Sequence, residues 1–395
     1  MALKAVHVSD VLCFDKVSET SELTLPSSSA STPCFSQGSE DSRAERKVYE
    51  LPGKFLVMGH RGYGMNMLQS PDRRMKSVKE NSVVSFNAAA GFPVDFIEFD
   101  VQVTKDECPV IFHDNFIITK LDHGELMEKR VTELTLDEFL SYGPQREPGN
   151  VVGRPLFRRT KDGRIFEWKV EDDAPLCTLH EVFENVDSTV GFNVELKFDD
   201  HMAYKETDLA RILQAVLRVV HDHAKDRAII FSSFHPDAAL LTRKLQCTYP
   251  VLFLTNGGSE IFADARRNSL DEAMKVCLSG RLQGIVSEVK AVLRNPGAVA
   301  LIKESCLSFI TYGQLNNIPE VVYMQHRIGV GGVIVDLVKE ITAIVSDFMT
   351  RSSEEAAAGE DIGGFKGVVV KGEVEISLLL KFIPELIQQS CHQSI

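Results

Sequence analysis

The sequence FIEFDVQVT, residues 96–104, decides the fold prediction because apolar and polar residues alternate along it. Every odd position from 97 to 103 is apolar, whereas every even position from 98 to 104 is polar. This period of two predicts a β-strand with two chemically different faces. In a closed barrel the outer strand face is buried under helices, so Glu98 and Asp100 would point inward.

A second stretch, FNVELKF at 192–198, repeats the alternation and places Glu195 and Lys197 on its polar face. Taken alone, either pattern also fits a strand with one solvent-exposed face. Taken together inside a barrel, the two strands would bring three carboxylates to one interior, those of Glu98, Asp100 and Glu195.

Further short apolar runs extend the pattern to eight predicted strands. These runs are FLVMGH (55–60), RAIIFSSF (227–234), PVLFLTN (250–256), QGIVSE (283–288), LSFITY (307–312) and GGVIVD (331–336). Segments with helical periodicity, such as 209–223 and 237–246, lie between them. The order predicts an α/β fold, a (β/α)₈ TIM barrel. An open doubly wound sheet is the alternative, but no Gly-rich dinucleotide fingerprint follows the first strand.

The chain divides into an arm, a barrel with an insertion, and a tail. Residues 1–48, rich in Ser, Thr and Pro from about residue 20, predict a flexible arm and possible transit peptide. The barrel domain is predicted over 49–350. A small inserted domain is predicted after the second strand, at about 116–188, because a structureless loop of that length is unusual. This segment holds the only Trp of the sequence. Residues 351–395 predict a linker and a C-terminal helix.

Composition narrows the function class. Asp plus Glu total 56 against 43 Lys plus Arg, a formal charge of −13, which argues against binding nucleic acid or anionic membranes. The sequence contains no apolar stretch long enough to predict a membrane-spanning helix or the core of a signal peptide. The eight cysteines form no CxxC pair, which indicates a reducing intracellular compartment. Acidic residues in the arm argue against a transit peptide, so cytosol and plastid both stay open, and the sequence leaves the oligomeric state open.

The residues themselves point to metal-assisted phosphoryl transfer. Three confined carboxylates need a cation, and an all-oxygen ligand set suits Mg²⁺, Ca²⁺ or Mn²⁺ rather than Zn²⁺. His60 ends the first predicted strand, and His113 ends the run PVIFHD (109–114), a hairpin return after the second strand. A lone His is usually structural, but a pair at strand ends beside these acids indicates acid/base catalysis. Arg61 suits a phosphate group. Lys197 is either an ion-pair partner of Glu195 or a second phosphate cation, and we favour the second interpretation.

Several motifs then resemble one family in order and spacing, the glycerophosphodiester phosphodiesterases. They are GHRG (59–62), ENSVVSFNAA (80–89), FIEFDVQVTKDECPVIFHD (96–114), PLCTLHEVF (175–183) and GFNVELK (191–197). The resemblance covers about 55–345. The segments at 229–239, 250–262 and 292–296 look most like the eukaryotic branch that hydrolyses glycerophosphocholine, in a plant-like form.

The resemblance implies a barrel with a small insertion and one divalent cation, Mg²⁺ first and Ca²⁺ second. The family's positions fall on metal ligands Glu98, Asp100 and Glu195, acid/base histidines His60 and His113, phosphate-contacting Arg61 and Lys197, and site-lining Glu80 and Asn81. Two departures occur: Tyr312, which is expected to contact the substrate, and Asn316 stand where many bacterial members have Trp and Asn, and Asp336 lacks the usual following Pro.

Together with these residues, the resemblance implies hydrolysis of a small-molecule glycerophosphodiester, such as glycerophosphocholine or glycerophosphoethanolamine, to sn-glycerol 3-phosphate and an alcohol. Attack by a glycerol hydroxyl would give a cyclic phosphate that water opens, and the roles of the two histidines stay open. The alternatives are a phospholipase C-like or sphingomyelinase D-like barrel acting on membrane lipid, a metal-dependent barrel lyase or isomerase, and a non-catalytic binding barrel.

Overall fold

The computed structural model describes residues 54–121, 123–146 and 153–357. Within them, eight parallel strands close into a barrel, because β1 pairs with both β2 and β13. The strands are β1 (Leu56–Gly59), β2 (Phe96–Val103), β8 (Gly191–Leu196), β9 (Ile229–Ser233), β10 (Val251–Thr255), β11 (Gly284–Glu288), β12 (Ser308–Tyr312) and β13 (Gly332–Val335). All eight predicted strands are present, and the predicted (β/α)₈ TIM barrel is confirmed.

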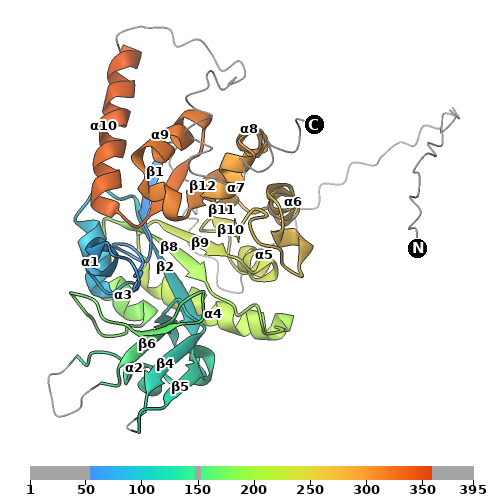
Figure 1. The fold of residues 1–395 in the computed structure, drawn as a ribbon. Coiled ribbons are helices and arrows are strands. Elements are labelled where there is room, and N and C mark those ends of the chain that lie inside the picture. Colours follow the sequence, from blue (N-terminus) through green and yellow to red (C-terminus); the bar gives the residue numbers. More distant parts are fainter. Residues whose placement is uncertain (1–53, 122, 147–152, 358–395) are drawn as a thin grey trace, which may run out of the picture. The chain divides into compact units, whose positions relative to one another are not determined.

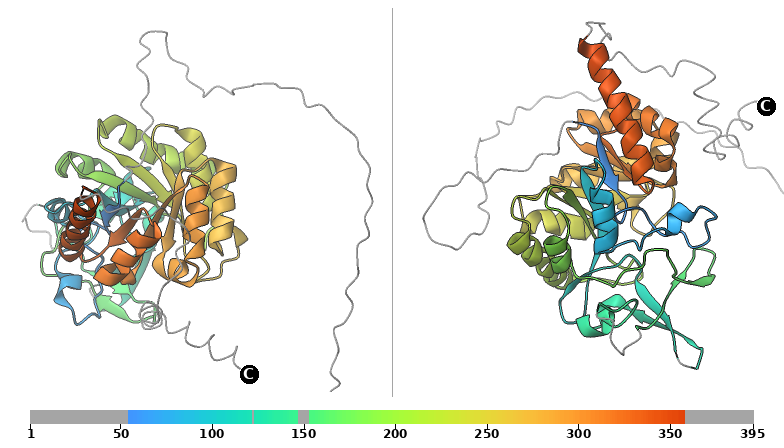
Figure 2. Two further views of the ribbon diagram at one scale, coloured as in Figure 1. Left: turned by 90° about the horizontal axis from the view of Figure 1, so that it is seen from above. Right: turned by 90° about the vertical axis from the view of Figure 1, so that its left-hand side faces the viewer.

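Helices surround these strands, as the view in Figure 2 (left) shows. They are α1 (Val83–Ala90), α3 (Leu179–Asn185), α4 (Glu206–His223), α5 (Pro236–Leu245), α6 (Leu270–Gly280), α7 (Val289–Arg294), α8 (Gly297–Glu304), α9 (Pro319–Ile328) and α10 (Val338–Ala357). Short 3₁₀ turns are η1 (Arg73–Lys76), η2 (Val131–Glu133), η3 (Ala265–Arg267) and η4 (Gln314–Asn317). Within the described residues, no helix is long and apolar enough to cross a membrane.

The outward face of β2 and β8 is apolar, as their alternation predicts. The Phe99 ring lies 5.1 Å from the ring of Phe86 on α1 and 5.1 Å from the ring of Phe192 on β8. All three side chains are fully buried. The inward face therefore receives the polar residues, and the strand register sets Asp100 directly opposite Glu195.

Most inward side chains over the first part of the strands are apolar, and the buried Asn193 beside Met58 is an exception. We call this layer the apolar plug: Leu56, Met58, Phe96, Ile230, Leu252, Leu254, Val286, Ile310 and Ile334. Because side chains two positions apart share a strand face, the next inward positions include His60 after Met58 and Asp336 after Ile334. The plug thus fills the barrel below a polar layer at the carboxyl ends of the strands.

A separate antiparallel sheet follows the second barrel strand. Its strands are β4 (Phe116–Lys120), β5 (Leu126–Arg130), β6 (Leu156–Arg159) and β7 (Ile165–Glu167), in the order β5-β4-β6-β7. The short strand β3 (Pro109–Ile111) pairs with β2, and α2 (Leu136–Leu140) lies within this region. In Figure 1 the second sheet lies below the barrel strands.

The elements at the edges of the predicted domains have clear packing. Helix α3 packs in the helical layer of the barrel, because its buried Val182 and Phe183 join the same cluster as Phe192 and Val194. Helix α10 continues to Ala357, past the predicted domain end at 350. The predicted arm at 1–48 and the rest of the predicted linker and C-terminal helix lie outside the described residues, and the predicted domain boundaries stay a prediction.

Candidate active site

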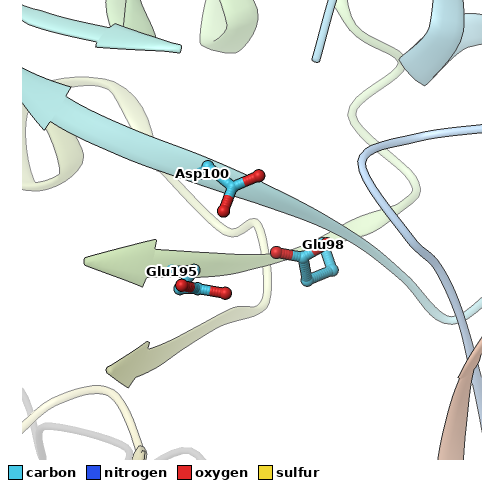
Figure 3. Close-up of side chains that lie close together, drawn as sticks. All are labelled: Glu98, Asp100 and Glu195. Carbon is cyan, nitrogen blue, oxygen red and sulfur yellow. The ribbon is translucent and has the colours of Figure 1, made fainter. Parts of the chain in front are cut away.

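Three buried carboxylates face one another inside the barrel. Glu98 and Asp100 project from β2 and Glu195 from the neighbouring β8, as Figure 3 shows. One carboxylate oxygen from each lies within 4.8 Å of the other two, and all three residues are buried. Alternation on β2 puts both of its acids on one face, and the parallel register brings the third alongside.

The cluster has more negative charge than its protein neighbours neutralise. Burial and the neighbouring Asp100 carboxylate raise the pKa of Glu98 to about 8. Burial also raises the pKa of Glu195, although Lys197 opposes the change. Burial acts on Asp100 as well, but His113, Lys197 and Arg61 outweigh it and hold the pKa of this carboxyl below 3.8.

These acids fit a divalent cation. A buried carboxyl whose pKa rises to about 8 beside two further carboxylates shows a shortage of positive charge at this point. Three carboxylates provide the hard oxygen donors that Mg²⁺, Mn²⁺ and Ca²⁺ take, and the cluster contains no nitrogen or sulfur ligand that would favour Zn²⁺.

His60 follows β1, and a carboxylate from the last barrel strand holds its ring. Its Nδ1 lies 2.7 Å from Oδ1 of Asp336, while Asn317 donates from Nδ2 to Oδ2 of Asp336 at 2.9 Å. Burial lowers the pKa of His60, but the Asp336 charge and hydrogen bond outweigh it, so the pKa lies above 6.5. The contact at Nδ1 leaves Nε2 for the site.

His113 follows β3 and pairs with the next residue in the chain. Its Nδ1 lies 2.7 Å from Oδ1 of Asp114. Burial, together with the positive charges of Arg61 and Lys197, lowers the pKa of His113 to about 4. The two histidines therefore have the same carboxylate-held geometry but opposite pKa shifts, which is the difference that an acid and a base at one site require.

Arg61 approaches the carboxylates through a strained turn. Its φ of 51° is in the left-handed region that costs energy for a non-Gly residue. The turn lets its backbone N–H donate to Oε2 of Glu98 at 2.9 Å and its Nη1 to Oε1 of Glu80 at 2.8 Å. Its Nε, 3.5 Å from Oδ2 of Asp100, is buried with no hydrogen-bond partner among the described residues. That donor is therefore available to an anionic group.

Lys197 sits on the same inward face as Glu195. Its Nζ lies 2.9 Å from Oε1 of Glu195 and 3.5 Å from Oδ1 of Asp100. Burial lowers the pKa of Lys197, but these two carboxylates outweigh burial and raise it above 10.5. Of its two predicted roles, the ion pair is the contact that the structure contains, and the phosphate contact stays a prediction.

Glu80 and Asn81 hold other residues of the site. The fully buried Glu80 side chain accepts hydrogen bonds from Arg61, from Arg158 and from the backbone N–H of Asn66. Burial raises its pKa, but the two arginines outweigh burial and lower it to about 2. Asn81, whose φ is 53°, donates from Nδ2 to Oδ2 of Asp100 at 2.8 Å. Their predicted contacts with substrate stay a prediction.

Tyr312 and Asn316, at the end of β12 and in η4, contact other parts of the barrel. Tyr312 donates from its hydroxyl to Oδ1 of Asn256, and burial raises its pKa well above 10. Asn316 is fully buried and donates to the backbone carbonyls of Thr311 and Ile334, so it supports the barrel wall. The next residue, Asn317, reaches the site instead, through Asp336.

A search against known families finds a match whose span includes all of these site positions. The model described as the glycerophosphoryl diester phosphodiesterase family matches residues 60–340. The chain belongs to this family. The predicted family and the predicted enzyme class, a glycerophosphodiester phosphodiesterase, are confirmed.

Similar members of the family come from plants and fungi. The glycerophosphodiester phosphodiesterase GDPD3 of Arabidopsis thaliana is 54% identical over 92% of this chain and 99% of its own length. The chloroplastic glycerophosphodiester phosphodiesterase GDPD1 of the same plant is 54% identical over 98% of this chain and 100% of its own length. The glycerophosphocholine phosphodiesterase GDE1 of Candida albicans is 32% identical over 71% of this chain and 28% of its own length.

Solved structures of two phosphodiesterases share the fold. A glycerophosphodiester phosphodiesterase from Parabacteroides distasonis aligns with a TM-score of 0.52 at 18% identity, over 75% of this chain and 99% of that chain. A phosphodiesterase from Oleispira antarctica, in complex with the product sn-glycerol-3-phosphate, aligns with a TM-score of 0.51 at 19% identity, over 74% of this chain and 96% of that chain. Both likenesses support the barrel fold.

In the present chain, the carboxylate site opens into a cleft of about 540 Å³. His113, Glu195 and Lys197 line its inner end. The outer walls come from the second sheet, with Phe116, Ile118, Glu128 and Arg159, and from barrel loops, with Phe198, Phe234, Asn256, Phe262 and Arg267. Both parts of the molecule thus enclose the space next to the carboxylates, which suits a small substrate held at the carboxyl ends of the strands.

Sequence reasoning missed three residues that contact the predicted site residues or their partners: Asp114, Arg158 and Asn317. Asp114 carried a local signal, because an acid directly follows His113. Arg158 and Asn317 carried none, since each contacts its partner across a long separation in the chain.

Proposed function

We propose that the protein hydrolyses glycerophosphodiesters, including glycerophosphocholine and glycerophosphoethanolamine, to sn-glycerol 3-phosphate and the free alcohol in a metal-dependent reaction. One observation carries the proposal. Two histidines, each held by a carboxylate, have opposite pKa shifts, and they lie with one arginine and one lysine side chain around three buried carboxylates. Family membership supports the reaction class, and the product bound to the Oleispira antarctica phosphodiesterase supports the glycerol 3-phosphate half.

Glu98, Asp100 and Glu195 would hold one divalent cation, Mg²⁺ or Ca²⁺. When bound, the ion supplies Lewis-acid chemistry: it neutralises phosphate charge and lowers the pKa of a coordinated hydroxyl. The raised pKa of Glu98 supports this assignment, because protein groups alone leave its carboxylate poorly compensated.

Arg61 and Lys197 would bind the non-bridging phosphate oxygens. The free Nε of Arg61 points to this role, and the backbone N–H of the same residue fixes Glu98. A guanidinium held by Glu80 and a nearby ammonium stabilise charge that builds up on phosphorus oxygens in the transition state. Glu80 and Asn81 would keep Arg61 and Asp100 in place, and Tyr312 would line the wall on the Asn256 side.

The two histidines would divide proton transfer between them. His113, neutral near pH 7, would take the proton from the attacking glycerol hydroxyl, and His60, charged through Asp336, would protonate the departing alcohol oxygen. The hydroxyl oxygen forms a bond to phosphorus as the bond to the alcohol breaks, leaving a cyclic phosphate. Water then opens the ring with the two roles exchanged, giving sn-glycerol 3-phosphate.

In the cell, this reaction would serve phospholipid turnover and phosphate recycling. We place the protein in the plastid or the cytosol. The likeness to a chloroplastic relative at 54% identity favours the plastid.

Product analysis tests the proposed function. Purified protein with added Mg²⁺ or Ca²⁺ is given glycerophosphocholine, glycerophosphoethanolamine and glycerophosphoinositol, and the products are resolved by ³¹P NMR. We expect glycerol 3-phosphate from at least the first two substrates. Release of phosphocholine, or no turnover of any substrate with either metal, would contradict the proposal.

A further inference from the structure

A buried arginine from the second sheet reaches two acids of the barrel. Arg158 on β6 donates from Nε to Oδ2 of Asp114 at 2.8 Å, and from Nη2 to Oε1 of Glu80 at 2.6 Å. Its Nη1 donates to Oε2 of Glu80 at 3.0 Å and to the backbone carbonyl of Asn66 at 3.3 Å. All three nitrogens of one guanidinium are therefore engaged.

The partners of Arg158 are themselves the supports of the chemical groups. Oδ1 of Asp114 makes the hydrogen bond with Nδ1 of His113. Nη2 of Arg158 donates to the same oxygen at 3.2 Å. Glu80 shares Oε1 between Arg158 and Arg61. Arg158 is therefore linked to His113, and to the Arg61 guanidinium predicted to bind phosphate, through one acidic residue in each case.

An aromatic ring holds the guanidinium from the side. Cζ of Arg158 lies 3.8 Å from the centroid of the Trp168 ring, and Nε1 of Trp168 donates to Oδ1 of Asn66 at 2.9 Å. Arg158 is 8% exposed and Trp168 is 4% exposed. The next residue on β6, Arg159, has the opposite fate: it is exposed and pairs with Glu128 on the neighbouring sheet surface. Arg158 thus contacts the acids beside the carboxylate cluster, whereas Arg159 lines the wall of the cleft.

Stability alone is a weak reason for this arrangement. Burying a charged network costs desolvation, and replacing such a network by apolar side chains is often neutral or stabilising. A planar fork that satisfies two carboxylates at once has a geometric use, however, because it fixes how both acids are oriented.

We propose that Arg158 is a positioning residue through which the inserted sheet orients His113 and Arg61 for the reaction. This inference rests on the proposed function. Arg158 acts through Asp114 on the imidazole and through Glu80 on the guanidinium, and it touches no reacting atom. The insertion is then part of the catalytic apparatus and not only a wall of the cleft.

Substitutions at Arg158 in the full-length protein test the proposal. Arg158→Met keeps the length of the side chain but removes the fork, and we expect kcat for glycerophosphocholine to fall between about 10-fold and 100-fold, with KM changing less than kcat. Arg158→Lys keeps the charge but satisfies one acid at a time, so its kcat should lie between those of the wild type and the Met variant. Arg164→Met, at an exposed arginine paired with Asp162 in the connection between β6 and β7, is the matched control and should keep the wild-type kcat.

A double-mutant cycle separates positioning from a general loss of structure. If Arg158 acts through Asp114, Arg158→Met should cost much less in an Asp114→Asn background than in the wild type. Full activity of folded Arg158→Met, or losses that multiply in the cycle, would overturn the proposal. If the Met variant does not fold, Arg158→Lys decides, and wild-type kcat in that variant would overturn it. An inactive wild-type protein would instead refute the proposed function itself.

Discussion

The apolar plug and the polar layer above it are built from the same strands, yet they have opposite chemistry. On β2, Phe96 belongs to the plug, and Glu98 and Asp100 are the next inward residues. The plug is satisfied by contact alone, because it contains only apolar side chains. The polar layer needs a dense set of partners, and even then the pKa of Glu98 is raised to about 8. Apolar side chains therefore fill one layer of the barrel interior, and the titratable groups of the predicted site occupy the other.

The histidines of the polar layer give the largest expected effect. His60→Ala and His113→Ala should each lower kcat by about 10²-fold to 10⁴-fold, because proton transfer at one oxygen is lost. Glycerol 3-phosphate release measures the loss of kcat. The thermal unfolding temperature, measured on the same variants, should change little. His221→Ala, at a 90% exposed histidine on α4, is the control. Near-normal turnover in both folded histidine variants would remove the chemistry from this layer.

The plug should show the reverse pattern. Leu252→Ala leaves a cavity in the barrel interior and should lower the free energy of unfolding by about 2–5 kcal/mol, as buried leucines do. The kcat per folded molecule should stay near that of the wild type. Urea unfolding and activity corrected for the folded fraction measure the two quantities. A large loss of kcat with unchanged stability would show that the two layers are not separable in this way.

Asp336 sharpens the comparison within the polar layer, since it acts on one histidine only. Asp336→Asn removes the charge that raises the pKa of His60, so that pKa should fall. If His60 must be protonated, the alkaline limb of the pH profile of kcat/KM moves to lower pH. The acidic limb, assigned to His113, should stay in place. A shift of the acidic limb, or no shift at all, would contradict the assignment of the two roles.

The smallest expected effect concerns the stability of metal-free protein. A carboxyl whose folded pKa lies above its unfolded value favours the fold at low pH, and that contribution is lost as pH rises through about 8. Glu98→Gln should therefore stabilise chelated protein at pH 8 by on the order of 1 kcal/mol. Differential scanning calorimetry in excess chelator measures it. A destabilised Gln variant would show that the acids are compensated without a cation.

The sequence predicted the parts of this design that depend on strand alternation. The positions of Glu98, Asp100 and Glu195 follow from a period of two on adjacent strands, and His60 and His113 follow from strand ends. These are local patterns, and an apolar outer face fixes the direction of each side chain.

Contacts that depend on how distant segments of the chain meet could not be predicted from the sequence. Arg158 and Asp114 are 44 positions apart, and their contact depends on how the second sheet lies on the barrel. The choice between Asn316 and Asn317 depends on the phase of the 3₁₀ turn η4, where a shift of one residue exchanges a wall position for a site position. Neither choice has a signal in composition or periodicity.

Metal removal and return is the most direct test of the central claim that the polar layer needs a cation to work. Protein is dialysed exhaustively against chelator, freed of it, and assayed for glycerol 3-phosphate release from glycerophosphocholine before and after Mg²⁺ or Ca²⁺ is added. We predict that activity is lost and that one of these ions restores it in wild-type protein but not in Glu195→Gln. Full activity in protein shown to be free of metal by elemental analysis would contradict the account.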